Sequence, residues 1–311
     1  MVGTGVRPAP PYWWYRLSVH VHVKHRIDSQ ASPAASVAAR LEEAIEQVVL
    51  GQETAVHDVL LAVLAGGACL FVGPSGVGKS LMGSAVAQAL SAPFAEIAAT
   101  PDAREAHLPE SGVVVIGELM RTPPAVRAAL IDARAGVTAL FATHNPHDQA
   151  EWPLTEAELD RFMLSTLFDY PTAEEERALL RRSATPSAEG TIALEELMRA
   201  RADVAEVPAA SNVIEYAARL ARSTRPLHDG EAPPFVHELV ASGAGPRGAQ
   251  ALLAAARAHA LLDGAAAVSL DDVDAVARAA LRHRIRISDA ARRQGLSADD
   301  VIARILPLAR E

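Results

Sequence analysis

The chain has 311 residues, of which 50% are hydrophobic and only 4% are aromatic. This length allows a large buried core in one large or two smaller domains, and the abundance of alanine and leucine favours helices over a β-sandwich or β-barrel. The formal net charge of −9 argues against a surface that attracts nucleic acid, which is therefore not an expected partner.

The first 36 residues are rich in proline, aromatic residues and histidine, and we expect them to form a tail outside the main fold. His20 and His22 would share one face of an extended segment, which leaves open a metal site or a solvated arm. The segment lacks the features of a secretory signal, and no apolar run in the chain is long enough to span a membrane. We therefore expect a soluble, cytoplasmic protein.

A helical pattern begins at Val37, and a second helix is expected from about residue 53 to residue 65. A short apolar strand, Ala68 to Val72, then leads into a glycine-rich turn and a helix from about Lys79 to Leu90. The single cysteine, Cys69, lies in this strand, where we expect a buried thiol. A strand, a glycine-rich turn and a helix in this order are the context that a phosphate-binding loop (P-loop) requires.

The turn reads G-P-S-G-V-G-K-S and matches the P-loop pattern G-x-x-x-x-G-K-[ST] at every required position. Backbone N–H groups of the loop would surround the phosphates, Lys79 would neutralise the β and γ oxygens, and Ser80 would bind magnesium. A purely structural glycine turn is the alternative, but a match this complete arises by chance in roughly one chain per hundred of this length. We therefore predict a site for ATP and Mg²⁺ formed by Gly73, Pro74, Ser75, Gly76, Val77, Gly78, Lys79 and Ser80.

Further buried strands are expected at residues 94–97, 113–116 and 138–142, with a helix at residues 125–135 between the last two. Strands that alternate with helices predict an α/β domain over residues 37–172. Its sheet would be parallel and doubly wound, flanked by helices, with the ligand at the carboxyl ends of the strands.

After Pro171 the strand signals stop, and successive helical patterns predict a smaller all-α domain over residues 173–311. Within it, Arg282, His283, Arg284 and Arg286 form a local basic run. This run is where a basic surface stripe could exist despite the acidic net charge.

Five segments in this order carry a resemblance to a known family. They read EQVVLGQETAVHDVLLAVLAGGACLFVGPSGVGKS, VVVIGELMRTPPAVRAALIDA, FATHNPHDQAEWPLTEAELDRFM, GAGPRGAQALLAAARAHALLDG with LRHRI, and GLSADDVIARIL. From about Leu41 onward the chain resembles the MoxR family of AAA+ ATPases. The resemblance implies a P-loop AAA+ module followed by a small helical lid domain.

The resemblance also implies roles for single residues. Glu118 would act as general base on the attacking water, and Asn145 would orient that water or contact the γ-phosphate. Arg161 would reach the nucleotide of a neighbouring subunit as an arginine finger, and Arg247 would contact the γ-phosphate from the lid. Taken singly, each residue has a simpler interpretation: a turn before a proline for Asn145, a surface ion pair of Asp160 with Arg161, or a helix start for Arg247.

Two features depart from the family pattern. The strand at residues 113–116 ends in Gly117-Glu118 where the family has Asp-Glu, so the carboxylate that normally supports magnesium is missing. Ser80, phosphate oxygens and water would then hold the metal, which leaves nucleotide binding intact and puts turnover in question. The stretches at residues 98–111 and 135–139 are also short, so contacts with a client protein are not defined by the resemblance.

The resemblance implies an ATP-hydrolysing, chaperone-like protein that forms a homo-oligomeric ring, expected to be a hexamer. Such a ring would remodel or activate a client protein, which in the family is often one with a von Willebrand A domain. The alternative is a nucleotide-binding scaffold or switch with little or no hydrolysis, which Gly117 favours. A DNA-dependent machine is disfavoured because no winged-helix or basic aromatic module follows the lid.

Overall fold

The computed structural model describes residues 33–98, 107–148, 152–182, 192–226 and 232–311, together with residues 187, 188 and 190. Helix α1 (Pro33–Val48) begins earlier than residue 37, the expected start of the folded domain. His20 and His22 lie outside the described residues. None of the helices in these ranges combines the length and the apolar composition of a membrane span.

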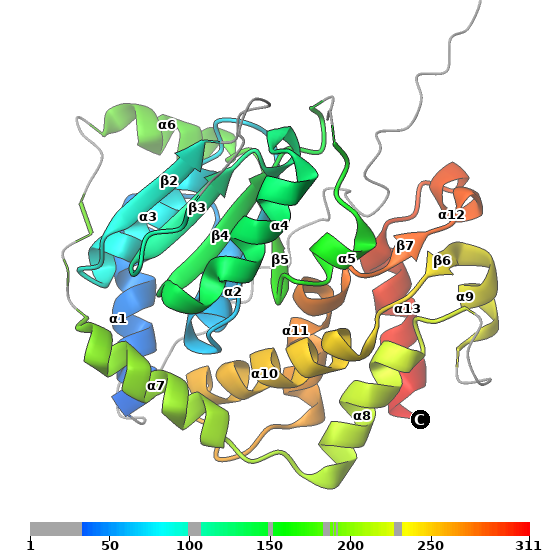
Figure 1. The fold of residues 1–311 in the computed structure, drawn as a ribbon. Helices are drawn as coiled ribbons and strands as arrows, with labels where there is room; N and C mark the ends of the chain where they lie inside the picture. The colour runs from blue at the N-terminus through cyan, green and yellow to red at the C-terminus, as the bar shows by residue number, and fades with distance from the viewer. Residues whose placement is uncertain are drawn as a thin grey trace, which may run out of the picture.

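The centre of the described structure is a five-stranded parallel sheet with the spatial order β2-β3-β4-β1-β5 (Figure 1). The strands are β1 (Cys69–Val72), β2 (Phe94–Ala98), β3 (Val113–Gly117), β4 (Ala139–His144) and β5 (Leu164–Leu167). The first four confirm the expected strands. Strand β5 was not predicted, because its sequence LSTL has two polar residues in a run of four.

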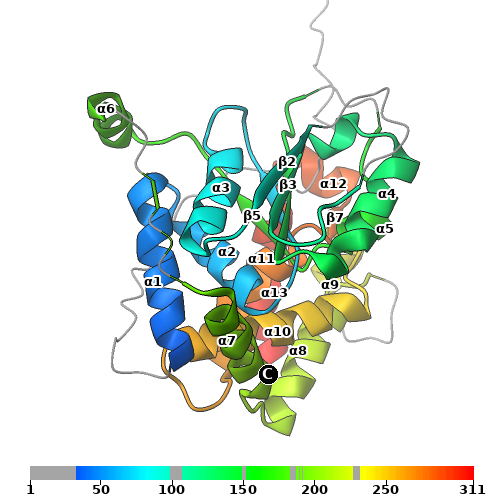
Figure 2. The ribbon, with the colours of Figure 1, turned by 60° about the vertical axis from the view of Figure 1, so that its left-hand side comes forward.

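Helices cover both faces of this sheet, as Figure 2 shows. Helices α2 (Glu53–Leu64) and α3 (Lys79–Ala89) lie on one face with α1 outside them, and α4 (Pro124–Asp132) lies on the other. The inner strands β1, β3 and β4 are accordingly apolar and buried along almost their whole length. Strand β2 forms one edge of the sheet and alternates exposed with half-buried residues.

A helical lid follows the sheet, so the α/β module with a lid is confirmed. Its helices are α7 (Leu194–Glu206), α8 (Ser211–Arg222), α9 (Pro234–Leu239), α10 (Pro246–Leu262), α11 (Leu270–Leu281), α12 (Asp289–Arg293) and α13 (Ala298–Arg310), while α6 (Ala173–Arg181) precedes them. Ser269 and Ser297 begin α11 and α13 with capping boxes. The lid also contains two short antiparallel strands, β6 (Val240–Ser242) and β7 (Arg286–Ile287), which are too short to leave a pattern in the sequence.

The basic run of the lid is not a surface stripe. The Arg282 guanidinium is buried, donating to both carboxylate oxygens of Asp299 (2.9 and 3.0 Å) and to the Ser165 carbonyl of β5. Arg284 is also buried and donates to Asp160 Oδ1 (2.9 Å), and His283 contacts the Phe162 carbonyl. These three side chains pack the lid against the sheet domain, and only Arg286 of the run is exposed, beside Glu156. The basic surface stripe that the sequence left open is therefore wrong.

The single cysteine lies in the core, as expected. Cys69 is the first residue of β1, which ends directly before the P-loop, and its side chain is 0% exposed. Burial raises the pKa of its thiol well above the ordinary value.

Candidate functional site

The P-loop connects β1 to α3, and its backbone requires glycine at defined places. Gly76 and Gly78 have φ values of 83° and 93°, in the left-handed region that side chains disfavour. At Gly73 a Cβ atom would lie only 2.2 Å from the Phe168 carbonyl oxygen, because the end of β5 passes close to the loop. The glycines therefore fix the shape of the loop rather than merely loosening it.

Lys79 is the first residue of α3, and its side chain folds back over the loop. Its Nζ donates to the Gly73 carbonyl at 2.8 Å and to the Pro74 carbonyl. Burial lowers the pKa of Lys79 from 10.5 to about 8, although the negative charges of Asp148 and Glu118 oppose this shift. An anion bound beside this cation would restore the stability of its charged form.

A cavity of about 380 Å³ opens beside the loop at the carboxyl ends of three strands. Its walls come from the loop itself, from the end of β2 and from the residues that end or follow β3 and β4. The residues outside the loop and α3 are Glu96, Ala98, Gly117, Glu118, Thr143 and Asn145. Two of the predicted site residues, Glu118 and Asn145, thus share one cavity with Lys79 and Ser80.

Glu118 follows β3 with an unusual backbone. Its φ and ψ angles of 47° and 55° are left-handed, which costs a non-glycine residue about 1 kcal/mol or more and is typical of functional sites. Its backbone N–H donates to Thr143 Oγ1 at 2.8 Å, and its carboxylate lies 3.0 Å from Arg121 Nε. Neither residue was predicted: Thr143 meets Glu118 only through the fold, whereas Arg121 is a local partner three residues further along the chain.

Asn145 lies opposite the P-loop, after the end of β4. Its Nδ2 donates to Ser75 Oγ at 3.2 Å and to Asp148 Oδ1 at 2.8 Å, and its Oδ1 accepts from the His147 backbone N–H. Asn145 therefore forms the ordinary turn and also lines the cavity. Its interpretation as a turn residue does not exclude its interpretation as a polar group of the site.

Arg161 and Arg247 are not among the residues that line the cavity. Arg161 follows α5 (Glu156–Leu159), and its Nη1 lies 3.1 Å from Asp132 Oδ1. Arg247, near the start of α10, is 62% exposed, with its Nη1 3.8 Å from Asp160 Oδ2. The structure thus pairs Arg161 with Asp132 and Arg247 with Asp160, and neither arginine lines the cavity of its own chain.

The helix that precedes Arg161 is firmly held. Arg127 of α4 is 1% exposed and donates to both carboxylate oxygens of Glu158, at 2.6 and 2.9 Å. Glu158 also completes the capping box that begins α5 at Thr155. A buried two-point ion pair of this kind fixes the position of α5 and hence of the residues directly after it.

The cavity also contains oxygen donors that suit magnesium. Ser80 Oγ donates a 2.6 Å hydrogen bond to Glu96 Oε1, and Glu118 supplies a second carboxylate to the same cavity. Hydroxyl and carboxylate oxygens are the ligands that Mg²⁺ prefers, so these residues fit the metal. Glu96 was not predicted from the sequence.

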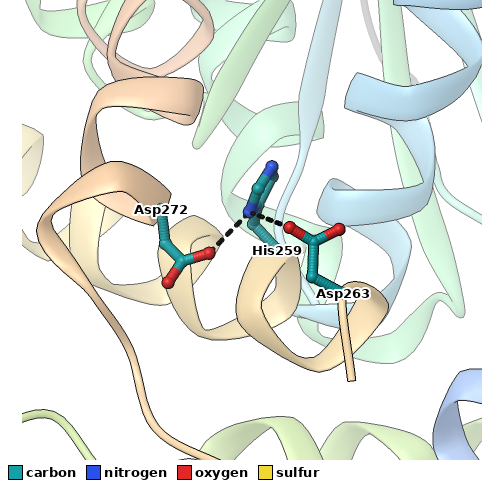
Figure 3. Close-up of side chains that lie close together, drawn as sticks. All are labelled: His259, Asp263 and Asp272. Carbon is teal, nitrogen blue, oxygen red and sulfur yellow. Dashed lines mark hydrogen bonds and ion pairs between the residues drawn. The ribbon is translucent and has the colours of Figure 1, made fainter. Parts of the chain in front are cut away.

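A second group of ligand-type side chains lies in the lid (Figure 3). His259 Nδ1 lies 2.7 Å from Asp272 Oδ1 and 3.7 Å from Asp263 Oδ2. The other Asp272 oxygen already accepts from Ser269, whose hydroxyl caps α11. This geometry indicates a contact that joins α10 to α11 rather than a second functional site.

Comparisons with known proteins agree with the order of the sheet domain and the lid. The model of the ATPase family associated with various cellular activities (AAA) matches residues 69–147, and the AAA lid domain matches residues 235–305. Chaperone MoxR1 of Mycobacterium tuberculosis is 30% identical over 299 residues, covering 84% of this chain and 79% of MoxR1. Protein MoxR of Paracoccus denitrificans is also 30% identical, covering 80% of this chain and 88% of its own length.

Two further comparisons extend over most of the chain. Uncharacterized protein YeaC of Bacillus subtilis is 29% identical over 302 residues, covering 85% of this chain and 91% of YeaC. The crystal structure of a Cytophaga hutchinsonii protein superposes with a TM-score of 0.77 and covers 88% of this chain and 96% of its own. At 23% sequence identity, this last comparison shows the fold alone.

Proposed function

Because the chain belongs to the MoxR family of AAA ATPases, we propose that it binds ATP with Mg²⁺ in the P-loop and hydrolyses it slowly. The hydrolysis would drive the remodelling or activation of a client protein. The observation that carries this proposal is one cavity lined by residues of the P-loop, Lys79 and Ser80 among them, and also by Glu118 and Asn145. These are the groups that bind phosphate, hold the metal and position a water for phosphoryl transfer.

Each residue has a defined task in the proposed mechanism. Lys79 would leave the loop carbonyls and contact the β and γ oxygens, while Ser80 Oγ and nearby carboxylates would hold Mg²⁺. When bound, this metal would supply positive charge against the negative charge that develops on the phosphates. Glu118 accepts the proton of the attacking water, and Asn145 holds that water in line with the bond to be broken.

The position of Arg161 supports an oligomer. Arg161 does not line the cavity of its own chain, as expected of an arginine that serves a nucleotide across an interface between subunits. We infer a homo-oligomeric ring, expected to be a hexamer, that acts in the cytoplasm, where ATP is available. A client with a von Willebrand A domain is expected from the family resemblance.

The second candidate is a nucleotide-dependent scaffold or switch with little or no hydrolysis. Gly117 favours it, because the strand end that should support the metal has no side chain. A steady-state phosphate-release assay on the purified protein separates the two candidates, since both bind ATP and only the first turns it over.

Replacing Lys79 by alanine tests the site directly. We expect ATP affinity to fall about 10- to 100-fold, the effect of removing one charge-assisted contact with phosphate, while the melting temperature stays close to that of the parent. The sequence offers a matched control, since Lys24 is the only other lysine. Lys24→Ala should bind ATP normally, and equal affinities for the parent and the Lys79 variant would show that the loop is not the nucleotide site.

The pH dependence of ATP binding provides an independent test. Lys79 has a pKa of about 8 in the free protein, and the phosphates should raise it on binding. Binding above pH 8 must then take up a proton, so affinity is full below pH 8 and falls by up to about tenfold for each pH unit above it. Calorimetry at pH 8.5 in two buffers of different ionisation enthalpy should detect this proton uptake. An affinity that does not change between pH 7 and pH 9 would contradict the assignment.

A further inference from the structure

Gly117 ends β3 without the expected carboxylate, but Glu96 of the neighbouring strand β2 places a carboxylate beside it. Strands β2 and β3 are parallel and in register, with Ala98 opposite Gly117 and Glu96 opposite Val115. The Glu96 side chain reaches the cavity from β2, and its Oε1 lies 2.6 Å from Ser80 Oγ. Ser80 is the residue whose hydroxyl is expected to bind magnesium, so Glu96 lies where a metal-supporting carboxylate is needed.

The geometry around Gly117 explains how this carboxylate fits. A Cβ atom at Gly117 would lie 3.7 Å from Glu96 Oε1 and 3.6 Å from the Ile97 carbonyl oxygen, both ordinary van der Waals distances. Gly117 is also outside the left-handed backbone region, so its conformation does not demand glycine. The carboxylate of Glu96 therefore occupies the space into which a side chain at position 117 would extend.

The Glu96 carboxylate is not engaged in another structural task. Within the part of the chain that the structure describes, its hydrogen-bond partner is Ser80, and no ion pair with an arginine holds it. Its residue is exposed on the edge strand, so a purely structural role in the core is excluded. A hydroxyl that donates to a carboxylate keeps its lone pairs available, which leaves Ser80 Oγ free to accept a cation.

We propose that Glu96 supplies the carboxylate of the magnesium site that Gly117 lacks. This inference rests on the proposed function, namely that the P-loop holds Mg²⁺ with ATP. The longer side chain of glutamate, compared with aspartate, reaches the same space from one strand further out in the sheet. The carboxylate that supports the metal thus lies on β2 instead of β3. A metal site retained in this way favours ATP hydrolysis over a passive scaffold.

Metal binding provides a test that does not depend on turnover. Mn²⁺ binding to the protein in the presence of ATP can be followed by electron paramagnetic resonance, because free Mn²⁺ gives the signal that binding removes. We expect Glu96→Gln to weaken Mn²⁺ affinity about 10- to 100-fold, the usual effect of losing a group that supports a metal ligand. ATP affinity in EDTA should stay unchanged or rise, since a negative charge beside the phosphates has been removed.

Two further variants sharpen the test. Glu43 lies exposed on α1, so Glu43→Gln is a matched control that should leave Mn²⁺ binding unchanged. The double variant Glu96→Ala with Gly117→Asp should bind Mn²⁺ more tightly than Glu96→Ala alone, because the carboxylate returns from β3. The contacts at Gly117 leave room for the added Cβ atom, and a thermal melt confirms that each variant is folded.

The outcomes separate this inference from the proposed function. Unchanged Mn²⁺ affinity in folded Glu96→Gln would overturn the role of Glu96 while ATP binding and its dependence on Lys79 still stand. If the double variant binds Mn²⁺ no more tightly than Glu96→Ala alone, the inference that a carboxylate on β2 replaces one on β3 is wrong. A parent protein that fails to bind ATP would refute the proposed function itself.

Discussion

Replacing Arg161 by alanine should lower the rate of ATP hydrolysis by about 10³- to 10⁵-fold and leave ATP affinity unchanged. Its guanidinium lies against Asp132 and outside the cavity of its own chain, so we expect it to stabilise the transition state at a neighbouring subunit. Phosphate release and nucleotide titration on the same preparation measure the two effects. Arg293, exposed on α12, provides the control, because Arg293→Ala should retain full activity.

Light scattering in the presence of ATP completes this experiment. We expect the parent and both arginine variants to form the same oligomer. Monomers alone, at a concentration at which the parent hydrolyses ATP, would rule out an arginine finger supplied by a neighbour.

The Glu118→Gln variant should bind ATP like the parent but hydrolyse it about 10²- to 10⁴-fold more slowly, because glutamine cannot accept the proton of the attacking water. The amide has nearly the shape of the carboxylate, so the loss reports chemistry rather than packing. A quenched single-turnover assay with labelled ATP should find the nucleotide bound and intact. Hydrolysis at the parental rate would remove Glu118 from the role of general base.

A mixture of the two inactive variants, Arg161→Ala and Glu118→Gln, tests the arginine finger and the general base together. In a mixed ring, some interfaces join an intact Glu118 of one subunit to an intact Arg161 of the next. Part of the activity should therefore return on mixing, provided that subunits exchange. If the mixture stays as inactive as its components after exchange has been verified by labelled subunits, the two residues do not form one shared site.

The P-loop and most of the sheet could be predicted from the sequence because their determinants are local. The pattern at Gly73 to Ser80 is contiguous, and strands β1, β3 and β4 are short apolar runs that lie buried on both faces. Strand β5 was missed because its buried Ser165 and Thr166 look like loop residues until the neighbouring strand is known.

The rest of the site depends on contacts between residues far apart in the chain. Glu96 meets Ser80 only because β2 lies next to β3 and α3 follows the loop, and no spacing in the sequence indicates this. The basic run at residues 282–286 could be taken for a surface stripe for a related reason. Asp299 and Asp160, the partners of Arg282 and Arg284, cannot be recognised as partners before the lid is placed against the sheet.

The position of the single cysteine has a practical consequence. Because the Cys69 thiol is fully buried and burial raises its pKa, a thiol reagent can reach and modify it only when the sheet beneath the P-loop opens. Under native conditions, the labelling rate of the unsubstituted chain therefore measures how often this core opens. The slowing of that rate by ATP would report how strongly nucleotide binding stabilises the strand that leads into the loop.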